Sequence, residues 1–348
     1  MKPRPTFELE VNGKRVRLGQ RTLIMGVLNV TPDSFSDGGE YLEPERAIEH
    51  GVELVDQGAD WLDVGGESTK PGSRPVTARE ELRRVLPVIQ GLRKKLRTLP
   101  ISIDTTKAEV AEEAVRAGAS IINDVSGLRF DPRLAEVAGR HRTPLILMHL
   151  RGRPETMQEN AFARSIWRSL RDGLERSIRR ALARGIHRSQ LIIDPGMGFG
   201  KSRRQNFEIL AQLERLHAFH LPILIGTSRK SFVQAVVVGQ GLEPSDVAPR
   251  IGGAHAGLKP GATLTRAKAH AGLKPGATLT RAKRRSTSYW PVIWAVGARH
   301  GMPLQIGDAA AVAASILGGA HIVRVHDVAA IFPAVRIAAA ILATGAGP

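Results

Sequence analysis

The sequence predicts an α/β protein built as a closed (β/α)8 barrel, with an N-terminal β-hairpin and an irregular basic insertion in the seventh βα unit. Two observations predict the barrel. Eight short apolar runs alternate with longer amphipathic stretches along the 348 residues, which is typical of parallel strands that are each followed by a helix. Nearly every apolar run also ends in polar residues, as strands of this barrel do on the face that carries active sites.

The predicted elements follow in order. Residues 7–11 and 14–18 alternate in hydropathy around Asn12-Gly13, the strongest short signal for a hairpin. The eight barrel strands are predicted at residues 23–29, 61–65, 101–104, 121–124, 144–149, 191–194, 222–227 and 321–326. The helices are predicted at residues 44–57, 77–96, 107–117, 132–141, 161–183 and 204–213, with a seventh that begins near residue 229 and resumes at 307–318, and a last at 328–342.

The seventh unit is irregular. Residues 254–268 and 269–283 are identical tandem copies, and nine Lys or Arg but no Asp or Glu lie between Arg250 and Arg285. Each copy contains Lys-Pro-Gly, a turn signal that interrupts helices. We expect residues 239–299 to form a flexible insertion within one barrel domain that spans residues 1–348.

The composition excludes several classes of protein. The net charge is +17, but only 4% of residues are aromatic, and no basic stripe is interleaved with the aromatic side chains that single-strand binders use. No apolar run approaches the roughly 18 residues of a membrane span. The chain has no cysteine, which excludes disulfides and thiolate zinc sites and is typical of a reducing compartment. We therefore expect a cytoplasmic protein that binds neither nucleic acid nor membranes.

The polar residues at the strand ends form a candidate site. Any one of them could be a helix cap, but residues from eight strands that meet on one rim favour a functional site. Arg324 and His326 are two residues apart on the last strand, so their side chains should point to the same face. A guanidinium offers a two-pronged donor to phosphate, and an imidazole offers a neutral or charged donor.

Seven blocks in the sequence carry a family resemblance: residues 26–39, 63–72, 103–105, 123–127, 194–201, 226–232 and 324–328. In this order they resemble the signatures of the dihydropteroate synthase family, pterin-binding barrel enzymes, over residues 7–238 and from 303 onward. The resemblance implies that the chain condenses 6-hydroxymethyl-7,8-dihydropterin diphosphate with 4-aminobenzoate in folate biosynthesis. Diphosphate would leave first, and the amine would then capture the pterin cation to give 7,8-dihydropteroate.

The resemblance also implies roles for particular residues. The pterin would be bound by Asp104, Asn123, Asp194, Phe199 and Lys230. The diphosphate would be bound by Asn29, Thr69, Lys70, Arg324 and His326, with Asn29 also a ligand of a Mg²⁺ cofactor. The 4-aminobenzoate would be bound by Phe35, Pro71 and Ser228. The catalytic residues would be Asp33, Asp104, Lys230, Arg324 and His326.

One position departs from the family pattern, and one property of the family concerns assembly. The second signature often reads Ser-Thr-Arg-Pro-Gly, whereas this chain has Lys70, which keeps the charge but loses the fork geometry of arginine. Family members are usually homodimers that pack through their last helices, so the resemblance implies a homodimer here.

Two other functions stay open on the sequence alone. Another pterin-binding barrel, such as a methyltetrahydrofolate-dependent methyltransferase, would share the Asp and Asn set but would not need Arg324 and His326. A non-catalytic relative would bind a pterin or an anion without turnover. The insertion motivates this second alternative, because it follows Lys230 and could distort the seventh helix.

Overall fold

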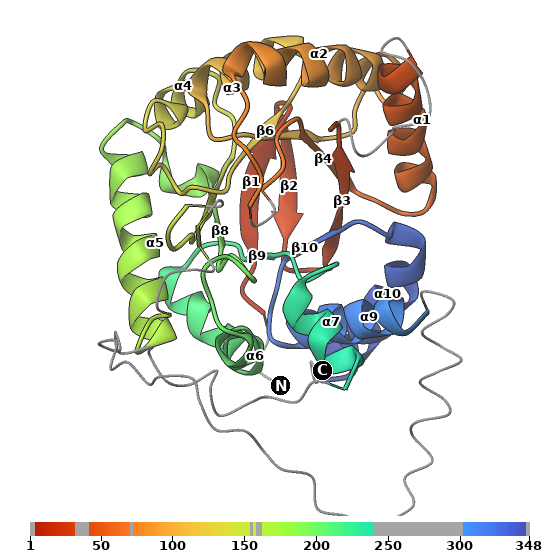
Figure 1. The fold of residues 1–348 in the computed structure, drawn as a ribbon, viewed down its shortest axis with the longest axis vertical. Helices are drawn as coiled ribbons and strands as arrows, with labels where there is room; N and C mark the ends of the chain where they lie inside the picture. The colour runs from red at the N-terminus through yellow and green to blue at the C-terminus, as the bar shows by residue number, and fades with distance from the viewer. Residues whose placement is uncertain are drawn as a thin grey trace, which may run out of the picture.

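Eight parallel strands form a barrel in the computed structural model, which describes residues 4–31, 42–69, 72–153, 156–157, 162–239 and 302–345. The strands neighbour one another in the order β8-β7-β6-β5-β4-β3-β10-β9. A bridge between Ile193 and Ile223 brings the last strand beside the first, so the sheet closes on itself. The helices surround the strands (Figure 1).

The bounds of the elements are these. The strands are β1 Phe7–Val11, β2 Lys14–Leu18, β3 Leu23–Asn29, β4 Trp61–Gly65, β5 Ile101–Asp104, β6 Ile121–Asp124, β7 Leu145–Met148, β8 Leu191–Asp194, β9 Leu224–Ile225 and β10 Ile322–Val325. The α-helices are α1 Leu42–Asp56, α2 Ala78–Lys95, α3 Ala108–Ala117, α4 Leu134–Arg140, α5 Ile166–Leu182, α6 Arg203–Ala211, α7 Ser231–Val237, α9 Met302–Leu317 and α10 Val328–Gly345.

The main core lies between the strands and the helices. Helix α2 illustrates how the sequence builds it: Thr77 caps its N-terminus by accepting a hydrogen bond from the Glu80 amide, and Val85, Ile89 and Leu92 on one face are buried. Burial of such side chains contributes about 1.5–3 kcal/mol each. At Gly51 in α1 a Cβ atom would lie 2.7 Å from Leu92 Cδ2, so α1 and α2 approach closely there and a larger residue would displace the Leu92 side chain.

A second apolar cluster closes the end of the barrel where the strands begin. Leu9, Val11 and Leu18 of the hairpin pack there against strand residues such as Met25 and Trp61. His321, directly before β10, links the chain before the hairpin to the barrel. Its Nδ1 accepts a hydrogen bond from the Ile223 amide, and its Nε2 lies 3.0 Å from the carbonyl oxygen of Pro5. Burial lowers the pKa of His321 to about 4, so this neutral, bonded form holds at neutral pH. The hairpin therefore seals this end.

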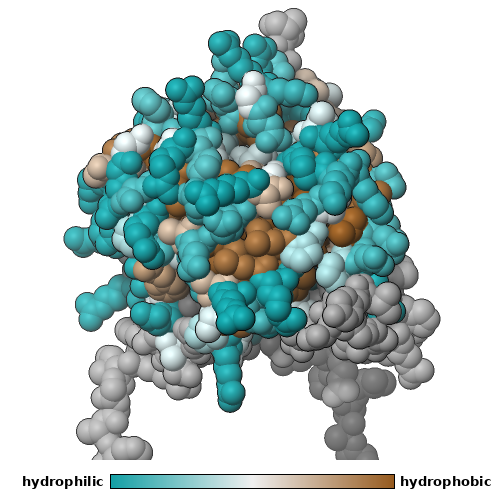
Figure 2. All heavy atoms as spheres, turned by 90° about the horizontal axis from the view of Figure 1, so that it is seen from above, coloured by the Kyte–Doolittle hydropathy of each residue, from teal (hydrophilic) through white to brown (hydrophobic). Residues whose placement is uncertain are grey.

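Hydrophilic side chains cover most of the face seen in Figure 2, with a smaller apolar area among them. The amphipathic helices explain this, because their apolar sides turn toward the barrel. Within the described ranges, no helix combines the length and the apolarity that a membrane crossing needs.

The predicted barrel and hairpin are confirmed, and the differences lie at the element ends. Helix α5 begins at Ile166 rather than near 161, because the Ser165 hydroxyl accepts a hydrogen bond from the Arg168 amide and caps it there. Strand β9 is only two residues long, and Pro222 before it has no N–H to donate to a ladder. The predicted insertion at 239–299, with its copies 254–268 and 269–283, lies outside the described residues apart from Gly239, and stays a prediction.

Candidate active site

Four polar side chains from four strands meet at the carboxyl end of the barrel. Arg324 on β10 donates through Nε to Asp63 Oδ2 at 2.6 Å and through Nη2 to Asp104 Oδ2 at 2.8 Å. Asn123 on β6 donates through Nδ2 to the same Asp63 oxygen at 2.9 Å. These contacts join residues up to 261 positions apart in the sequence, and they define the centre of the site.

The centre holds two carboxylates for one guanidinium. Burial raises the pKa of Asp104 to about 8, with Arg324 acting against this shift and Asp63 adding to it. Burial opposes the charge of Arg324, but Asp63 and Asp104 together raise the pKa of its guanidinium. The raised pKa favours the protonated form of Asp104 at neutral pH more than in an ordinary aspartate.

Asp194 ends β8 and is 6% exposed. Its Oδ1 accepts a hydrogen bond from the Gly196 amide at 2.6 Å. Gly196 has a φ of +66°, and a Cβ there would lie 2.2 Å from the carbonyl oxygen of His149, so the turn requires glycine. Burial raises the pKa of Asp194 to about 6, against the effects of the Gly196 amide and Lys230. At neutral pH the carboxylate is ionised.

Lys230 and Phe199 lie together beside this carboxylate. The Lys230 Nζ is 4.1 Å from the centroid of the Phe199 ring. Burial lowers the pKa of Lys230 to about 8, and Arg324 lowers it further while Asp194 and Asp104 raise it. Phe199 also packs with Met148 in an apolar cluster on the same side of the barrel. A flat ring with polar edges fits such a combination of aromatic surface, ammonium and carboxylates.

Lys201 was not among the predicted site residues. Its Nζ is buried and donates to three backbone carbonyls, those of His149, Gly196 and Phe199, at 3.1, 2.7 and 3.1 Å. The ammonium thus fixes the glycine-rich turn that presents Phe199. The sequence shows a lysine at the end of the glycine-rich stretch Gly196–Lys201, but no pattern in it indicates that the lysine side chain binds the backbone of that stretch.

Ser228 lies between a histidine and a carboxylate. Its Oγ donates to Asp308 Oδ2 at 3.2 Å and lies 3.3 Å from His326 Nδ1. Asp308 Oδ2 also accepts from the Arg229 amide at 2.9 Å, which holds Arg229 at a φ of +56°. Asp308 was not predicted, because it lies on α9, 80 residues from Ser228 in the sequence.

The predicted set is therefore brought together in part. Arg324 turns toward Asp63 and Asp104, whereas His326 contacts Ser228 at the end of β9. Asp63 is fully buried at the centre and had no predicted role. Thr69 borders a cavity of about 400 Å³ that Lys107 and Val125 also line. Four predicted site residues lie outside the described residues: Asp33, Phe35, Lys70 and Pro71.

A magnesium site was predicted at Asn29, which ends β3. In the described part of the chain, no group of three or more His, Asp or Glu side chains is placed to hold a metal ion. The Asn29 Oδ1 lies near the end of β4, since a Cβ on Gly65 would be 3.9 Å from it. A single amide oxygen fits a Mg²⁺ ion that takes most of its other ligands from substrate phosphates and water.

Comparisons with known proteins identify the family to which the chain belongs. The family model described as pterin binding enzyme matches residues 25–267. A dihydropteroate synthase of Synechocystis is 44% identical over 251 residues, which are 72% of this chain and 83% of the relative. The chain belongs to the dihydropteroate synthase family. A synthase of Bacillus subtilis is also 44% identical, over 63% of this chain and 74% of its own.

Solved structures of dihydropteroate synthases share the fold. The Xanthomonas albilineans enzyme with 4-aminobenzoic acid is 34% identical, covers 99% of this chain and 100% of its own, and has a TM-score of 0.72. The same enzyme in complex with 7,8-dihydropteroate is 33% identical, with a TM-score of 0.69 over 98% of this chain and 100% of its own. As a dihydropteroate synthase, this chain is a transferase of folate biosynthesis, and the methyltransferase alternative is set aside.

Proposed function

We propose that the cluster of Arg324 with Asp63, Asp104 and Asn123, together with Asp194 and Lys230, is where this dihydropteroate synthase binds its pterin and breaks the bond to diphosphate. The observation that carries the proposal is Arg324, which donates to carboxylates from two strands at 2.6 and 2.8 Å. Such a preorganised set of charges at a barrel rim suits a reaction in which a cation forms and an anion departs.

The pterin ring has an amide-like and a guanidine-like edge, which paired hydrogen bonds can read. Asp194 is ionised at neutral pH and accepts from ring N–H groups, while Lys230 donates to ring acceptors. Asn123 on β6 and Asp104 on β5 form hydrogen bonds to the same ring, and Phe199 stacks against it. The ionised Asp194 also favours the pterin cation electrostatically.

Departure of diphosphate breaks the C–O bond to the pterin methylene carbon, and the electron pair leaves with the diphosphate. Cationic, hydroxyl and amide donors are proposed to receive this charge: Arg324, His326, Thr69, Lys70 and Asn29. Mg²⁺ bound at Asn29 would neutralise charge on the diphosphate oxygens. Arg324 also neutralises Asp63 and Asp104, so its contacts with the diphosphate and with the carboxylates compete.

The amine of 4-aminobenzoate then attacks the methylene carbon. Its lone pair forms the C–N bond, and the nitrogen gives up one proton to water or to the released diphosphate. We assign its binding to Phe35, Pro71 and Ser228, and a catalytic role near it to Asp33. Ser228 lies next to His326 and Asp308, and its hydroxyl would turn from Asp308 to donate to a ligand carboxylate.

The experiment that tests the proposal is a coupled assay of diphosphate release. Purified protein with dihydropterin diphosphate, 4-aminobenzoate and Mg²⁺ is expected to turn over. Removal of divalent cations with EDTA should abolish most of this activity, and added Mg²⁺ should restore it, because the diphosphate loses its counter-charge. Full activity in EDTA would contradict the metal assignment. Pterin binding by calorimetry without any turnover would instead identify a non-catalytic relative.

We further propose that two copies associate through α9 and α10 and work in the cytoplasm. These helices pack against each other and expose Ile306, Ile337 and Ile341 at 64%, 65% and 44%, which is more apolar surface than isolated exposed residues explain. Light scattering should give twice the chain mass of 37.6 kDa, and Ile337→Glu should shift it toward the monomer. A monomeric wild type would contradict the dimer, and fractionation of cells would test the location.

A further inference from the structure

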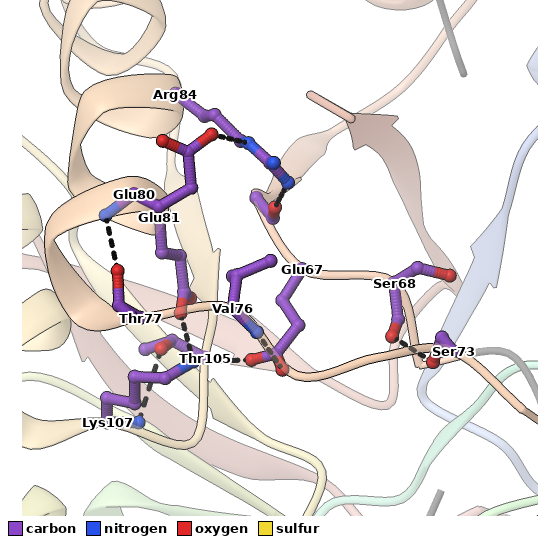
Figure 3. Close-up of polar contacts among 11 residues, drawn as sticks. Glu67, Ser68, Ser73, Val76, Thr77, Glu80, Glu81, Arg84, Thr105 and Lys107 are labelled. Atoms are coloured by element: carbon purple, nitrogen blue, oxygen red, sulfur yellow. Dashed lines mark hydrogen bonds and ion pairs between the residues drawn. The ribbon is translucent and has the colours of Figure 1, made fainter. Parts of the chain in front are cut away.

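Two glutamates share one lysine beside the rim of the barrel (Figure 3). The Lys107 Nζ lies 2.5 Å from Glu67 Oε2 and 2.6 Å from Glu81 Oε2. The Glu81 side chain is fully buried, and those of Lys107 and Glu67 are 23% and 16% exposed. The three residues come from the start of α3, the segment after β4 and helix α2. An ion group with so little solvent contact has a definite geometry, unlike a surface ion pair.

The charges of this group are unequal, so Lys107 is its critical member. Burial raises the pKa of Glu81, against the attraction of Lys107. Burial works against the charge of Lys107, but Glu81 and Glu67 together raise the pKa of its ammonium. The Oε1 atom of Glu81 has no hydrogen-bond partner among the described residues. Without Lys107, two carboxylates would face each other in a buried place.

Glu67 joins the two ends of the segment that carries Thr69; we call residues 67–68 and 73–76, where the segment leaves and rejoins the barrel, its stem. Its Oε1 accepts a hydrogen bond from the Val76 amide at 3.2 Å, and Ser73 Oγ donates to the Ser68 carbonyl at 2.6 Å. Both bonds cross from one side of the segment to the other (Figure 3). Glu67 therefore fixes where residues 68 and 69 leave the barrel and where residue 76 returns.

Lys107 links this stem to the pterin end of the site. It lies three residues after Asp104, which ends β5, and its backbone amide donates to Thr105 Oγ1 at 3.2 Å. The amide of the next residue, Ala108, donates to Asp131 Oδ2 at 3.0 Å. The loop from Asp104 to α3 is thus fixed at several points, and Lys107 extends from it to Glu67.

We propose that Lys107 is a positioning residue of the transfer reaction: held between Glu67 and Glu81, it sets the segment that bears Thr69 relative to Asp104, and so aligns the diphosphate with the bound pterin. This rests on the proposed function. The effect is indirect, because Lys107 acts through Glu67 and does not touch the reacting atoms. A displacement of about 1 Å in such a group costs on the order of a hundredfold in rate.

The test compares two ligands in four variants. The ligands are 6-hydroxymethyl-7,8-dihydropterin, which lacks diphosphate, and its diphosphate ester. Lys107→Met and Glu67→Gln should weaken binding of the ester and lower kcat by about tenfold or more, while the affinity for the free pterin changes less than twofold. Glu81→Gln should cost less than Glu67→Gln, because Lys107 then still holds Glu67. Arg116→Met is the matched control, since Arg116 is an exposed residue of α3 that pairs with Glu112 and Glu113 and not with Lys107, Glu67 or Glu81.

The outcomes separate this proposal from the proposed function. Equal losses in Glu67→Gln and Glu81→Gln, or equal weakening of both ligands, would overturn it, because the group would then support the fold alone. If Lys107→Met fails to fold, Glu67→Gln still tests the proposal, as it keeps the Lys107–Glu81 pair. A wild type that binds both ligands without turnover would refute the proposed function, yet the two affinities would still report on Lys107.

Discussion

Replacement of Arg324 by methionine is expected to lower kcat/KM by about 10²–10³, the usual cost of a preorganised charged donor. The guanidinium is held by Asp63 and Asp104 at 2.6 and 2.8 Å, so it is aligned before substrate arrives. Its loss removes a cation that we propose receives the departing diphosphate, takes the guanidinium from Asp104, and leaves Asp63 with Asn123 alone. The measurement is the coupled assay of diphosphate release at saturating 4-aminobenzoate.

The same change should destabilise the fold, so stability must be measured alongside. Loss of one partner of a buried ion pair costs about 3–5 kcal/mol. Arg324→Lys keeps the charge and should retain more stability than methionine, yet it should still lose most activity because it lacks the fork. Arg179→Met is the control, since it removes an exposed arginine that pairs with Glu175 on the same helix, α5. Activity of folded Arg324→Met within threefold of wild type would contradict the assignment.

The second large effect is expected in Asp194→Asn, which should weaken binding of the pterin about a hundredfold or more. The Gly196 amide already takes one oxygen of this side chain at 2.6 Å. An asparagine would use its single oxygen for that bond and present its NH₂ group to the N–H groups of the ring. Two donors that face each other in a buried site are costly. Calorimetry with the free pterin measures the loss directly.

The pH dependence of pterin binding gives an independent check. Asp194 has a pKa of about 6 and must be ionised to accept, so binding should weaken as the pH falls below that value. Lys230 and Asp104 both have a pKa of about 8, so above that pH Lys230 loses its charge, Asp104 ionises, and both changes shape the alkaline limb. Affinity should therefore be highest between the acid and the alkaline pKa values. Asp124 also has a pKa of about 6, so Asp124→Asn is the control: the acid limb should persist there and disappear in Asp194→Asn.

The sequence predicted the barrel well because its strands are short, continuous apolar runs that are buried on both sides. The ends of β3, β4, β5, β6 and β8 matched their predicted bounds, and the polar residues there marked the rim. Contacts across the barrel were less accessible. Asp63 looks like any polar residue in the run Trp61–Gly65, and only the folded barrel brings it within 2.6 Å of Arg324.

Residues that act through others were the ones missed. Asp308 lies on a helix far along the chain from Ser228, and no local pattern marks a buried carboxylate that holds a distant turn. Lys107 and Glu81 each read as the ordinary polar side of an amphipathic helix, and only tertiary packing makes them a pair. Residue type and spacing predict which side chains can take part in a reaction. Which side chains hold them in place depends on side-chain directions that are set only on folding.

The N-terminal hairpin closes one end of the barrel. Its apolar side chains fill the end of the barrel where the strands begin, and among the described residues the polar groups that serve chemistry all gather at the opposite end. The barrel is therefore open to ligands at one end only. Substrates and products thus reach and leave the site from the end of the barrel opposite the hairpin.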